Sequence, residues 1–273
     1  LTAANISFWT GRERNANDTI DATFVYGNHR VVYNVDTMYS GSPFHTPAYN
    51  GPLNAIACDY EVNFPPDDRL LGSQPFVLTA YDVNDGNFFF NDDSAQVDIT
   101  GNWIARKLGQ QYNYRRHVRV VVNGLYRGTI YDDTQQPNGE MLDEYFPDDV
   151  NGQLRKIESW FEFANDGQTH GSVYATLTRV NKSDGEIDPK RYRWNWRPRA
   201  TSNPENWTPF LNLVAAVNAT SAPNYADLVR TWMDVPNFLR PIVTHHICGS
   251  WDSYAYQRGK NMFAYKPDNA GWR

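Results

Sequence analysis

The spacing of apolar residues changes along this 273-residue chain, and that change restricts the fold more than any other feature. Up to about residue 180, polar and apolar residues alternate in short segments, as in strands that bury one face. In the last third, apolar residues recur every three or four positions, as in helices that bury one side. We therefore expect an α+β fold in one domain, with a β-rich lobe over residues 1–180, a mainly helical lobe over residues 181–273 and a cleft between them.

The clearest local signal in the first lobe is Asn123-Gly124, which separates two alternating segments. Both residues tolerate the positive φ that a type I′ turn requires, so we expect a hairpin of residues 117–122 and 125–131. Further strands are expected at residues 21–26, 29–35, 59–64, 74–80 and 171–180. Residues 82–93 are interpreted as a surface loop, and residues 148–163 as an acidic loop followed by a short mixed segment.

Helical periodicity predicts helices at residues 99–108, 140–145, 208–219 and 224–233. A further helix should begin after Asp234, whose side chain can cap it, with Pro236 in the first turn. We expect the buried face of this helix to carry Phe238, Leu239, Ile242, Val243 and His246.

The overall composition excludes several classes of function. With 31 acidic and 25 basic residues, the formal net charge is −6, so the chain lacks the field that attracts nucleic acid. No apolar run reaches the ~18 residues of a membrane span. The two cysteines, Cys58 and Cys248, allow at most one disulfide and do not have the spacing of zinc ligands. P-loop, Rossmann and nucleophile-elbow motifs are absent.

A polar, aromatic stretch near the end of the chain places Asp252 and Asn261 between a predicted helix and an alternating segment. In kinases, a loop Asp orients the substrate hydroxyl, and a following Asn holds Mg²⁺ through its side-chain oxygen. Here Asn261 follows Asp252 by nine positions, whereas the ordinary protein-kinase loop has five. From the residues alone, a polar connecting loop therefore remains an open alternative.

The same stretch resembles the late motif of the CotH-type atypical protein kinases, the spore coat protein CotH-like family. That motif reads G-N-W-D-S-Y, four residues, then G-K-N-M-Y-x-Y-K, and this chain has Gly249-Ser-Trp-Asp-Ser-Tyr254 and Gly259-Lys-Asn-Met-Phe-Ala-Tyr-Lys266. Residues 122–128 are similar to the family's N-G-x-Y-x-G strand pair, Leu154-Arg-Lys156 to its L-x-K segment, and Tyr39-Ser-Gly-Ser-Pro43 to an early R-G-(N)-S strand. The resemblance runs from about Asp21 to the end of the chain.

This resemblance implies a two-lobed, kinase-like fold and ATP-dependent phosphoryl transfer to Ser or Thr of a protein substrate, with Mg²⁺ or Mn²⁺. It implies that Asp252 is the catalytic-loop Asp and that Asn261 is a metal ligand. It further implies that Lys156 contacts the nucleotide phosphates, with Asp133 or its neighbour Asp132 as an acidic partner. A secreted or cell-surface location is expected on the same grounds.

The chain departs from the family pattern at two places. Its early segments, Gly41 to His45 and Ala55 to Tyr60, lack the Arg and Lys that the family often carries there. The family's W-D-x-D element would follow Arg273, so we expect this chain alone to lack one metal-binding Asp and to be inactive. The departures leave open a non-catalytic adhesin or coat-assembly module on the same fold, and the acidic loops leave open a glycan-active enzyme.

Overall fold

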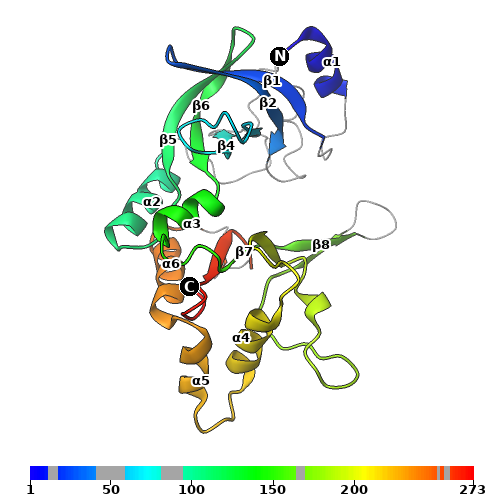
Figure 1. Ribbon diagram of the computed structural model, residues 1–273, viewed down its shortest axis with the longest axis vertical. Helices are drawn as coiled ribbons and strands as arrows, with labels where there is room; N and C mark the ends of the chain where they lie inside the picture. The colour runs from blue at the N-terminus through cyan, green and yellow to red at the C-terminus, as the bar shows by residue number, and fades with distance from the viewer. Residues whose placement is uncertain (12–17, 41–58, 81–94, 164–169, 251–252, 255–258) are drawn as a thin grey trace. The chain divides into compact units, whose positions relative to one another are not determined.

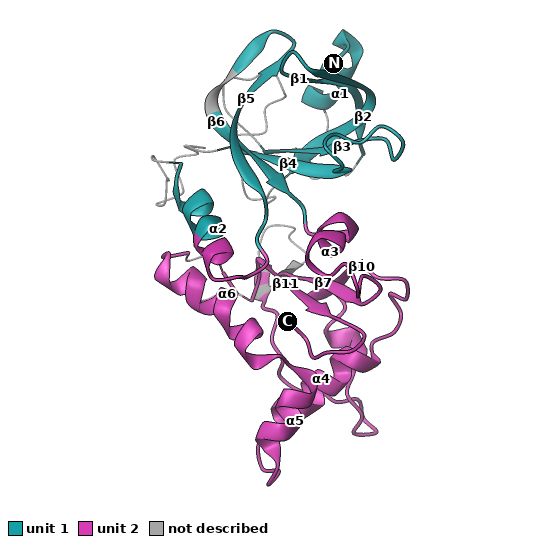
Figure 2. Ribbon diagram, turned by 60° about the vertical axis from the view of Figure 1, so that its left-hand side comes forward, with its two compact units in different colours: residues 1–103, 112–136 teal, residues 104–111, 137–273 magenta. Residues whose placement is uncertain are grey.

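The computed structural model describes residues 1–273 except 12–17, 41–58, 81–94, 164–169, 251–252 and 255–258 (Figure 1). The fold is mixed α/β, with a curled antiparallel sheet and, in the described part of the chain, six α-helices. It divides into two compact units (Figure 2). Unit 1 comprises residues Leu1–Trp103 and Tyr112–Gln136, and unit 2 comprises Ile104–Gln111 and Pro137–Arg273.

Unit 1 is built on a six-stranded antiparallel sheet with the strand order β1-β2-β3-β4-β6-β5. Its strands are β1 (Ile20–Tyr26), β2 (Arg30–Ser40), β3 (Asp59–Asn63), β4 (Pro75–Ala80), β5 (Arg115–Val122) and β6 (Leu125–Gln135). The predicted β5–β6 hairpin is confirmed, because φ is +49° at Asn123 and +82° at Gly124. The other strands expected before residue 82 are also confirmed, whereas the predicted loop at 82–93 lies outside the described residues.

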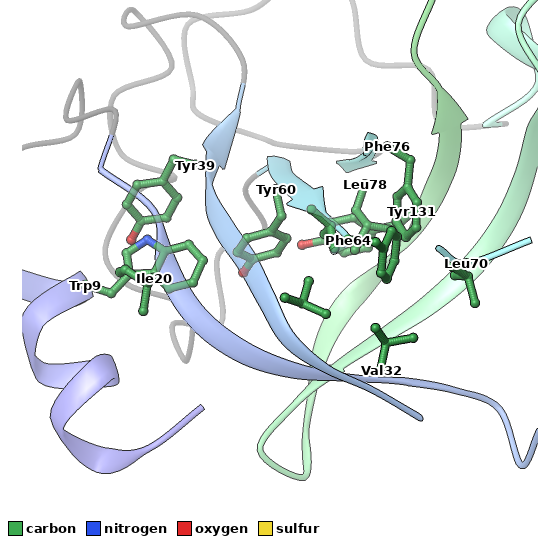
Figure 3. Close-up of a cluster of buried hydrophobic side chains, with 12 residues drawn as sticks. Trp9, Ile20, Val32, Tyr39, Tyr60, Phe64, Leu70, Phe76, Leu78 and Tyr131 are labelled. Atoms are coloured by element: carbon green, nitrogen blue, oxygen red, sulfur yellow. The ribbon is translucent and has the colours of Figure 1, made fainter. Parts of the chain in front are cut away.

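The sheet is curled (Figure 2), and its two edge strands, β1 and β5, are in contact through side chains. The Arg116 guanidinium of β5 donates a hydrogen bond to the Tyr26 hydroxyl of β1 and lies 5.1 Å from the centroid of that ring. Curling encloses an apolar core (Figure 3), to which helix α1 (Ala3–Gly11), absent from the sequence prediction, adds Trp9. The Trp9 ring meets the Tyr39 and Tyr60 rings edge-on, at centroid distances of 5.1 and 5.8 Å.

Unit 2 contains a three-stranded antiparallel sheet with the order β10-β7-β11 and a separate hairpin of β8 and β9. The strands are β7 (Gln153–Ile157), β8 (Trp160–Phe163), β9 (His170–Val173), β10 (Trp196–Ala200) and β11 (Met262–Lys266). The helices are α3 (Gly139–Tyr145), the short η1 (Pro189–Arg191), α4 (Thr208–Asn218), α5 (Tyr225–Trp232) and α6 (Val235–Ile247), while α2 (Val97–Lys107) begins in unit 1 and ends in unit 2. None of the helices formed by the described residues is long and apolar enough to cross a bilayer.

Two predictions in this unit were wrong. The segment at 148–163, interpreted as an acidic loop followed by a short mixed segment, contains β7, the central strand of the sheet, and β8. The strand expected at 171–180 ends at Val173. Beyond it, side chains hold the chain instead of a neighbouring strand: the Asn218 amide donates to the Leu177 carbonyl (2.6 Å), and the Tyr192 hydroxyl donates to the Thr178 carbonyl (2.8 Å).

Helix α6 begins as predicted but buries a different face. The Asn237 N–H donates to the Asp234 side chain (3.3 Å), which confirms the cap. Phe238 is buried as expected, yet Leu239 and Val243 are 48% and 53% exposed, and His246 is also exposed. Thr244 is buried in their place, because the Gln110 amide donates to its hydroxyl (3.2 Å) and so draws a polar face of the helix inward.

Candidate functional site

Strand β7 presents alternate side chains to two different environments. Arg155 and Ile157 belong to the face that packs on the core of unit 2, together with Trp196 and Ala264 of the neighbouring strands. Lys156 lies on the opposite face. It is paired in register with Arg197 of β10 on one side and with Phe263 of β11 on the other, and cross-strand partners share a face.

The buried neighbour of Lys156 is itself a cation. The Arg155 guanidinium lies 4.0 Å from the centroid of the Trp207 ring and donates to the Trp196 carbonyl (3.0 Å) and the Asn206 carbonyl (3.3 Å). Burial lowers the pKa of Arg155 to about 10. These contacts tie β7 to the segment before α4, so they fix the strand that carries Lys156.

Glu158 joins the two cations on the other face of β7. Its Oε2 lies 2.9 Å from the Lys156 Nζ, and its Oε1 accepts from the Arg197 guanidinium. The buried side chain of Asn195 holds the Glu158 backbone, donating to the Glu158 carbonyl and the Val173 carbonyl, both at 2.9 Å. The Glu158 N–H in turn donates to the Asn195 carbonyl (3.1 Å). These hydrogen bonds therefore fix the backbone position from which the Glu158 carboxylate extends, at the end of the sheet.

The loop between α6 and β11 is fixed at several described positions. Gly249, with φ at +67°, ends the helix. The Tyr254 ring packs edge-on against Trp196 and Phe238, and burial raises the pKa of its hydroxyl to about 12. The Gly259 carbonyl accepts from the Ala175 N–H (3.2 Å). Asp252 lies outside the described residues, so its catalytic role stays a prediction.

Asn261 is exposed and ends this loop in a left-handed conformation, with φ at +56°, directly before β11. Met262, the next residue, pairs with Ile157, which directly precedes Glu158. The fold therefore brings Asn261 and the Lys156–Glu158 pair to the same end of one sheet.

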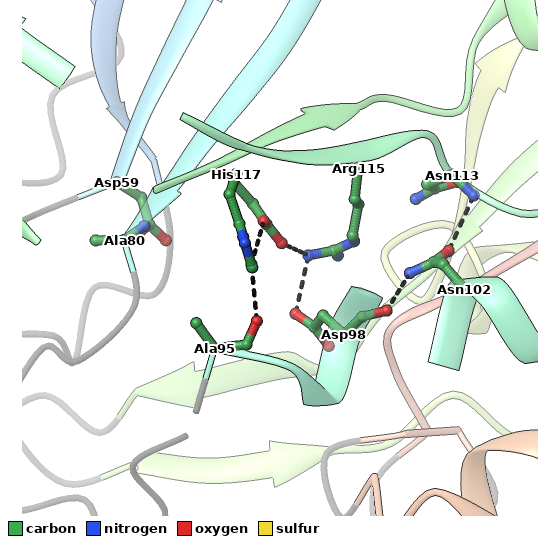
Figure 4. A network of polar contacts seen from close by, with 9 residues as sticks. Asp59, Ala80, Ala95, Asp98, Asn102, Asn113, Arg115 and His117 are labelled. Carbon is green, nitrogen blue, oxygen red and sulfur yellow. Dashed lines mark hydrogen bonds and ion pairs between the residues drawn. The ribbon is translucent and has the colours of Figure 1, made fainter. Parts of the chain in front are cut away.

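Asp133, the fourth predicted site residue, belongs to unit 1, whereas Lys156 and Asn261 belong to unit 2. On β6, its carboxylate forms an ion pair with Arg116. The neighbouring Asp132 is fully buried, and its Oδ2 lies 3.2 Å from Arg115, which also bonds Asp98 at 2.9 Å (Figure 4). Within unit 1 both acids thus have cationic partners, and their predicted role beside a nucleotide stays a prediction.

The same network includes a carboxyl group with an unusual proton affinity. The Asp59 side chain accepts a hydrogen bond from the Ala80 N–H (2.7 Å); both residues are labelled in Figure 4. Burial raises the Asp59 pKa to about 7, although this hydrogen bond and the positive charge of Arg115 both act to lower it. Part of the Asp59 population is therefore neutral near pH 7.

Few of the described side chains are placed to bind a divalent metal ion. Among the residues that the structure describes, no group of three or more His, Cys, Asp or Glu side chains could hold an ion. Asn261 offers one amide oxygen. Mg²⁺ commonly binds one or two protein oxygens and takes its remaining ligands from water and phosphate. The described residues therefore fit an ion that arrives with a polyphosphate better than a preformed protein cage.

A cavity of about 380 Å³ lies elsewhere in unit 2. It is formed by the segment after α3 and the turn after β11, and is lined by Tyr145, Phe146, Pro147, Asp148, Asp149, Pro267, Asn269, Ala270 and Arg273. The predicted site residues are not in its lining.

Sequence reasoning missed Glu158, Arg197 and Asn195. A usable signal was present, because Lys156 and Glu158 are two residues apart and would share one face of a strand. Because residues 148–163 were interpreted as an acidic loop followed by a short mixed segment, no strand was predicted there and this signal was not used. Arg197 and Asn195 reach the site only through strand pairing, which local patterns do not reveal.

The family model described as CotH kinase protein matches residues 60–273, which is more than half of the chain and includes most of β3 and all of β4 to β11. No curated protein sequence matches the chain.

Proposed function

Because the chain belongs to the CotH kinase protein family, we propose that the full-length protein transfers the γ-phosphoryl group of ATP to a Ser or Thr hydroxyl of a protein substrate. In this proposal the chain forms the two lobes of a kinase-like fold. Asp252 orients the accepting hydroxyl, Asn261 binds Mg²⁺ or Mn²⁺, and Lys156 contacts the phosphates. The acidic side chains of Asp132 and Asp133 belong to the other lobe.

One observation carries this proposal beyond the family match. The register of β7 and β11 brings the Lys156 ammonium and the amide of Asn261 to one end of the same sheet, although 105 residues separate them (261 − 156). Phosphoryl transfer depends mainly on positioning and on neutralising the charge of the phosphates. A cation on β7 and an amide oxygen directly before the adjacent strand β11 would meet both needs.

The contacts of the described residues support the proposed roles of Lys156 and Asn261. Lys156 stands on a strand that buried Arg155 anchors, so its ammonium is held by a rigid element. Asn261 follows Gly259, whose contact with Ala175 fixes the end of the loop. Asp252 is a base in reach of the hydroxyl proton in the proposed mechanism. Bound ATP with its metal would supply the transferred group and two or more charges for these residues to neutralise.

The test compares full-length wild-type protein with Asp252→Asn, each incubated with γ-labelled ATP, Mn²⁺ or Mg²⁺ and a generic Ser/Thr-containing protein. We expect label in the wild type and a loss of about 10²–10⁴-fold in the variant, which is the usual contribution of a positioned acid–base group. Asp227→Asn is the matched control, since it makes the same charge change on exposed α5 and should keep full activity. Absence of label from the wild type, or equal labelling by Asp252→Asn, would overturn the proposal.

Nucleotide binding separates this proposal from the alternative of a non-catalytic adhesin or coat-assembly module. ATP with Mg²⁺ should raise the melting temperature, because a ligand selective for the native state stabilises it by mass action. No shift, together with binding of a protein or glycan partner, would favour the alternative. A secreted or cell-surface location is proposed on family grounds, and fractionation of the source cells tests it.

A further inference from the structure

The open face of the three-stranded sheet carries two cations that share one carboxylate. We propose that Arg197 is a second phosphate-binding cation beside Lys156, and that Glu158 is an internal anion whose place a phosphate group takes. The ligand class is a polyphosphate, such as the phosphate chain of a nucleoside triphosphate. The inference rests on the proposed function and adds two residues to its site.

The geometry of the three side chains suits one oxyanion held by two cations. Lys156 and Arg197 are direct cross-strand partners, so their Cβ atoms are about 4.5–5.5 Å apart and their charged ends can converge on one group. They already do so, because Lys156 contacts Oε2 of Glu158 and Arg197 contacts Oε1. Two oxygens of a phosphate present the same kind of acceptor pair to a lysine and an arginine.

The charge balance also favours an added anion. The three groups carry two positive charges and one negative charge, which leaves a net charge of +1 on this part of the sheet. A polyphosphate carries several negative charges and can pair with both cations at once. The ion pairs themselves are partly exposed, at 36% for Lys156 and 55% for Arg197. Pairs of this kind contribute only about 0–1 kcal/mol to stability, so stability alone is a weak explanation for the arrangement.

The exposure of this face differs along the strand. Around Leu154 and Tyr265, the face packs against Leu142 of α3 and against Phe146, and Phe263, the partner of Lys156 on β11, also packs against this cluster. The side chains of Lys156 and Arg197 remain partly exposed. The part that carries Lys156, Arg197 and Glu158 lies at the opposite end of β7 from Gln153, next to the start of β11. Asn261 directly precedes that start, so a metal held there and a phosphate held by the two cations would belong to one ligand.

Isothermal titration of the wild-type protein with inorganic tripolyphosphate, ATP and adenosine, at low ionic strength, tests the inference. We expect Arg197→Gln to weaken binding of tripolyphosphate and ATP about tenfold, since a charge-assisted contact is lost. Glu158→Gln should strengthen binding of both, because the competing anion is removed. Arg199→Gln is the control: it makes the same change on the same strand, at an exposed residue two positions away, and should alter affinity less than twofold.

The outcomes separate the two proposals. If wild type binds ATP and transfers label, but Arg197→Gln and Glu158→Gln behave like Arg199→Gln, this inference is wrong and the proposed function stands. If wild type binds neither tripolyphosphate nor ATP, both fail. If Glu158→Gln weakens binding as much as Arg197→Gln does, Glu158 positions the cations and does not compete with phosphate, which also overturns the inference. Should Arg197→Gln fail to fold, Arg197→Lys keeps the charge and must retain affinity within about threefold.

Discussion

Replacing Gly259 by alanine should disturb the end of the α6–β11 loop, because no space exists for a side chain there. A Cβ at Gly259 would lie 2.2 Å from the Ala175 carbonyl oxygen and 2.5 Å from the Ala175 nitrogen. Ordinary contact between non-bonded heavy atoms begins near ~3.5 Å, so the two backbone segments must separate by roughly 1 Å. That movement also breaks the hydrogen bond from the Ala175 N–H to the Gly259 carbonyl.

The expected cost follows from these terms. Overpacking of this kind costs about 1–3 kcal/mol, and the lost hydrogen bond adds about 0.5–1.5 kcal/mol. Glycine-to-alanine replacement returns about 0.4–1 kcal/mol by restricting the unfolded chain. The net destabilisation of Gly259→Ala should therefore be about 1–3 kcal/mol. Gly171→Ala is the control, because a Cβ there meets nothing within 4 Å and the change should stay within about 0.5 kcal/mol.

Urea unfolding followed by tryptophan fluorescence measures the global effect, and hydrogen exchange at the Ala175 amide measures the local one. In Gly259→Ala, this amide should exchange faster than in the wild type, whereas Gly171→Ala should leave it unchanged. Equal unfolding free energies and equal Ala175 exchange for the two variants would refute the reasoning. Since Asn261 follows Gly259 by two residues, the same shift should also weaken metal-dependent binding of ATP.

Two further predictions concern unit 1 and α3. The Asp59 pKa is about 7 in the folded protein, whereas the ordinary value of an aspartate is 3.8, so the folded state keeps a proton that the unfolded state releases. The contribution of Asp59 to the unfolding free energy should therefore fall as pH rises from about 4 to 7 and be level on either side. Asp59→Asn should remove this pH dependence, which amounts to a few kcal/mol at most because one pKa unit corresponds to about 1.36 kcal/mol. Parallel pH profiles of the unfolding free energy for the two proteins would contradict the prediction. Asn138→Ala should lower the unfolding free energy by about 1 kcal/mol, because the Asn138 side chain caps α3 by accepting from the Met141 N–H (3.3 Å). An unchanged midpoint of urea unfolding would show that this cap does not contribute to stability.

The parts of the fold that sequence predicts are those with local causes. Asn123-Gly124 specifies its turn by backbone conformation alone, and Asp234 specifies a helix start by one side-chain hydrogen bond. The strands of unit 1 alternate because one face of each is buried. Strand β7 was missed for a different reason: Gln153, Leu154, Arg155 and Ile157 are all buried, so both faces are covered at the start of the strand and the alternation disappears.

The candidate site divides in the same way. Asp252 and Asn261 stand in one continuous stretch, so a motif finds them without knowledge of the fold. Glu158 and Arg197 are 39 residues apart and meet only because β10 pairs with β7. Likewise, alternation from Gly171 to Val180 predicts a strand, but the chain there finds carbonyl-binding side chains instead of a neighbouring strand. Which strands pair across many residues of sequence is decided by tertiary packing, and short sequence patterns do not encode it.

The central position of β7 has a consequence for how the protein is made. Its neighbours in the sheet are synthesised later, and Gly152, just before β7, bonds the Tyr265 hydroxyl of β11 across 113 residues of chain. At translation rates of about 5–20 residues per second, β7 leaves the ribosome roughly 6–23 seconds before β11 exists. Both hydrogen-bonding edges of the nascent strand stay open until β10 is synthesised, and the edge that pairs with β11 stays open for the whole interval. Unit 2 should therefore mature only after translation has passed β11, and its yield in a cell should depend on chaperones that shield β7 until then.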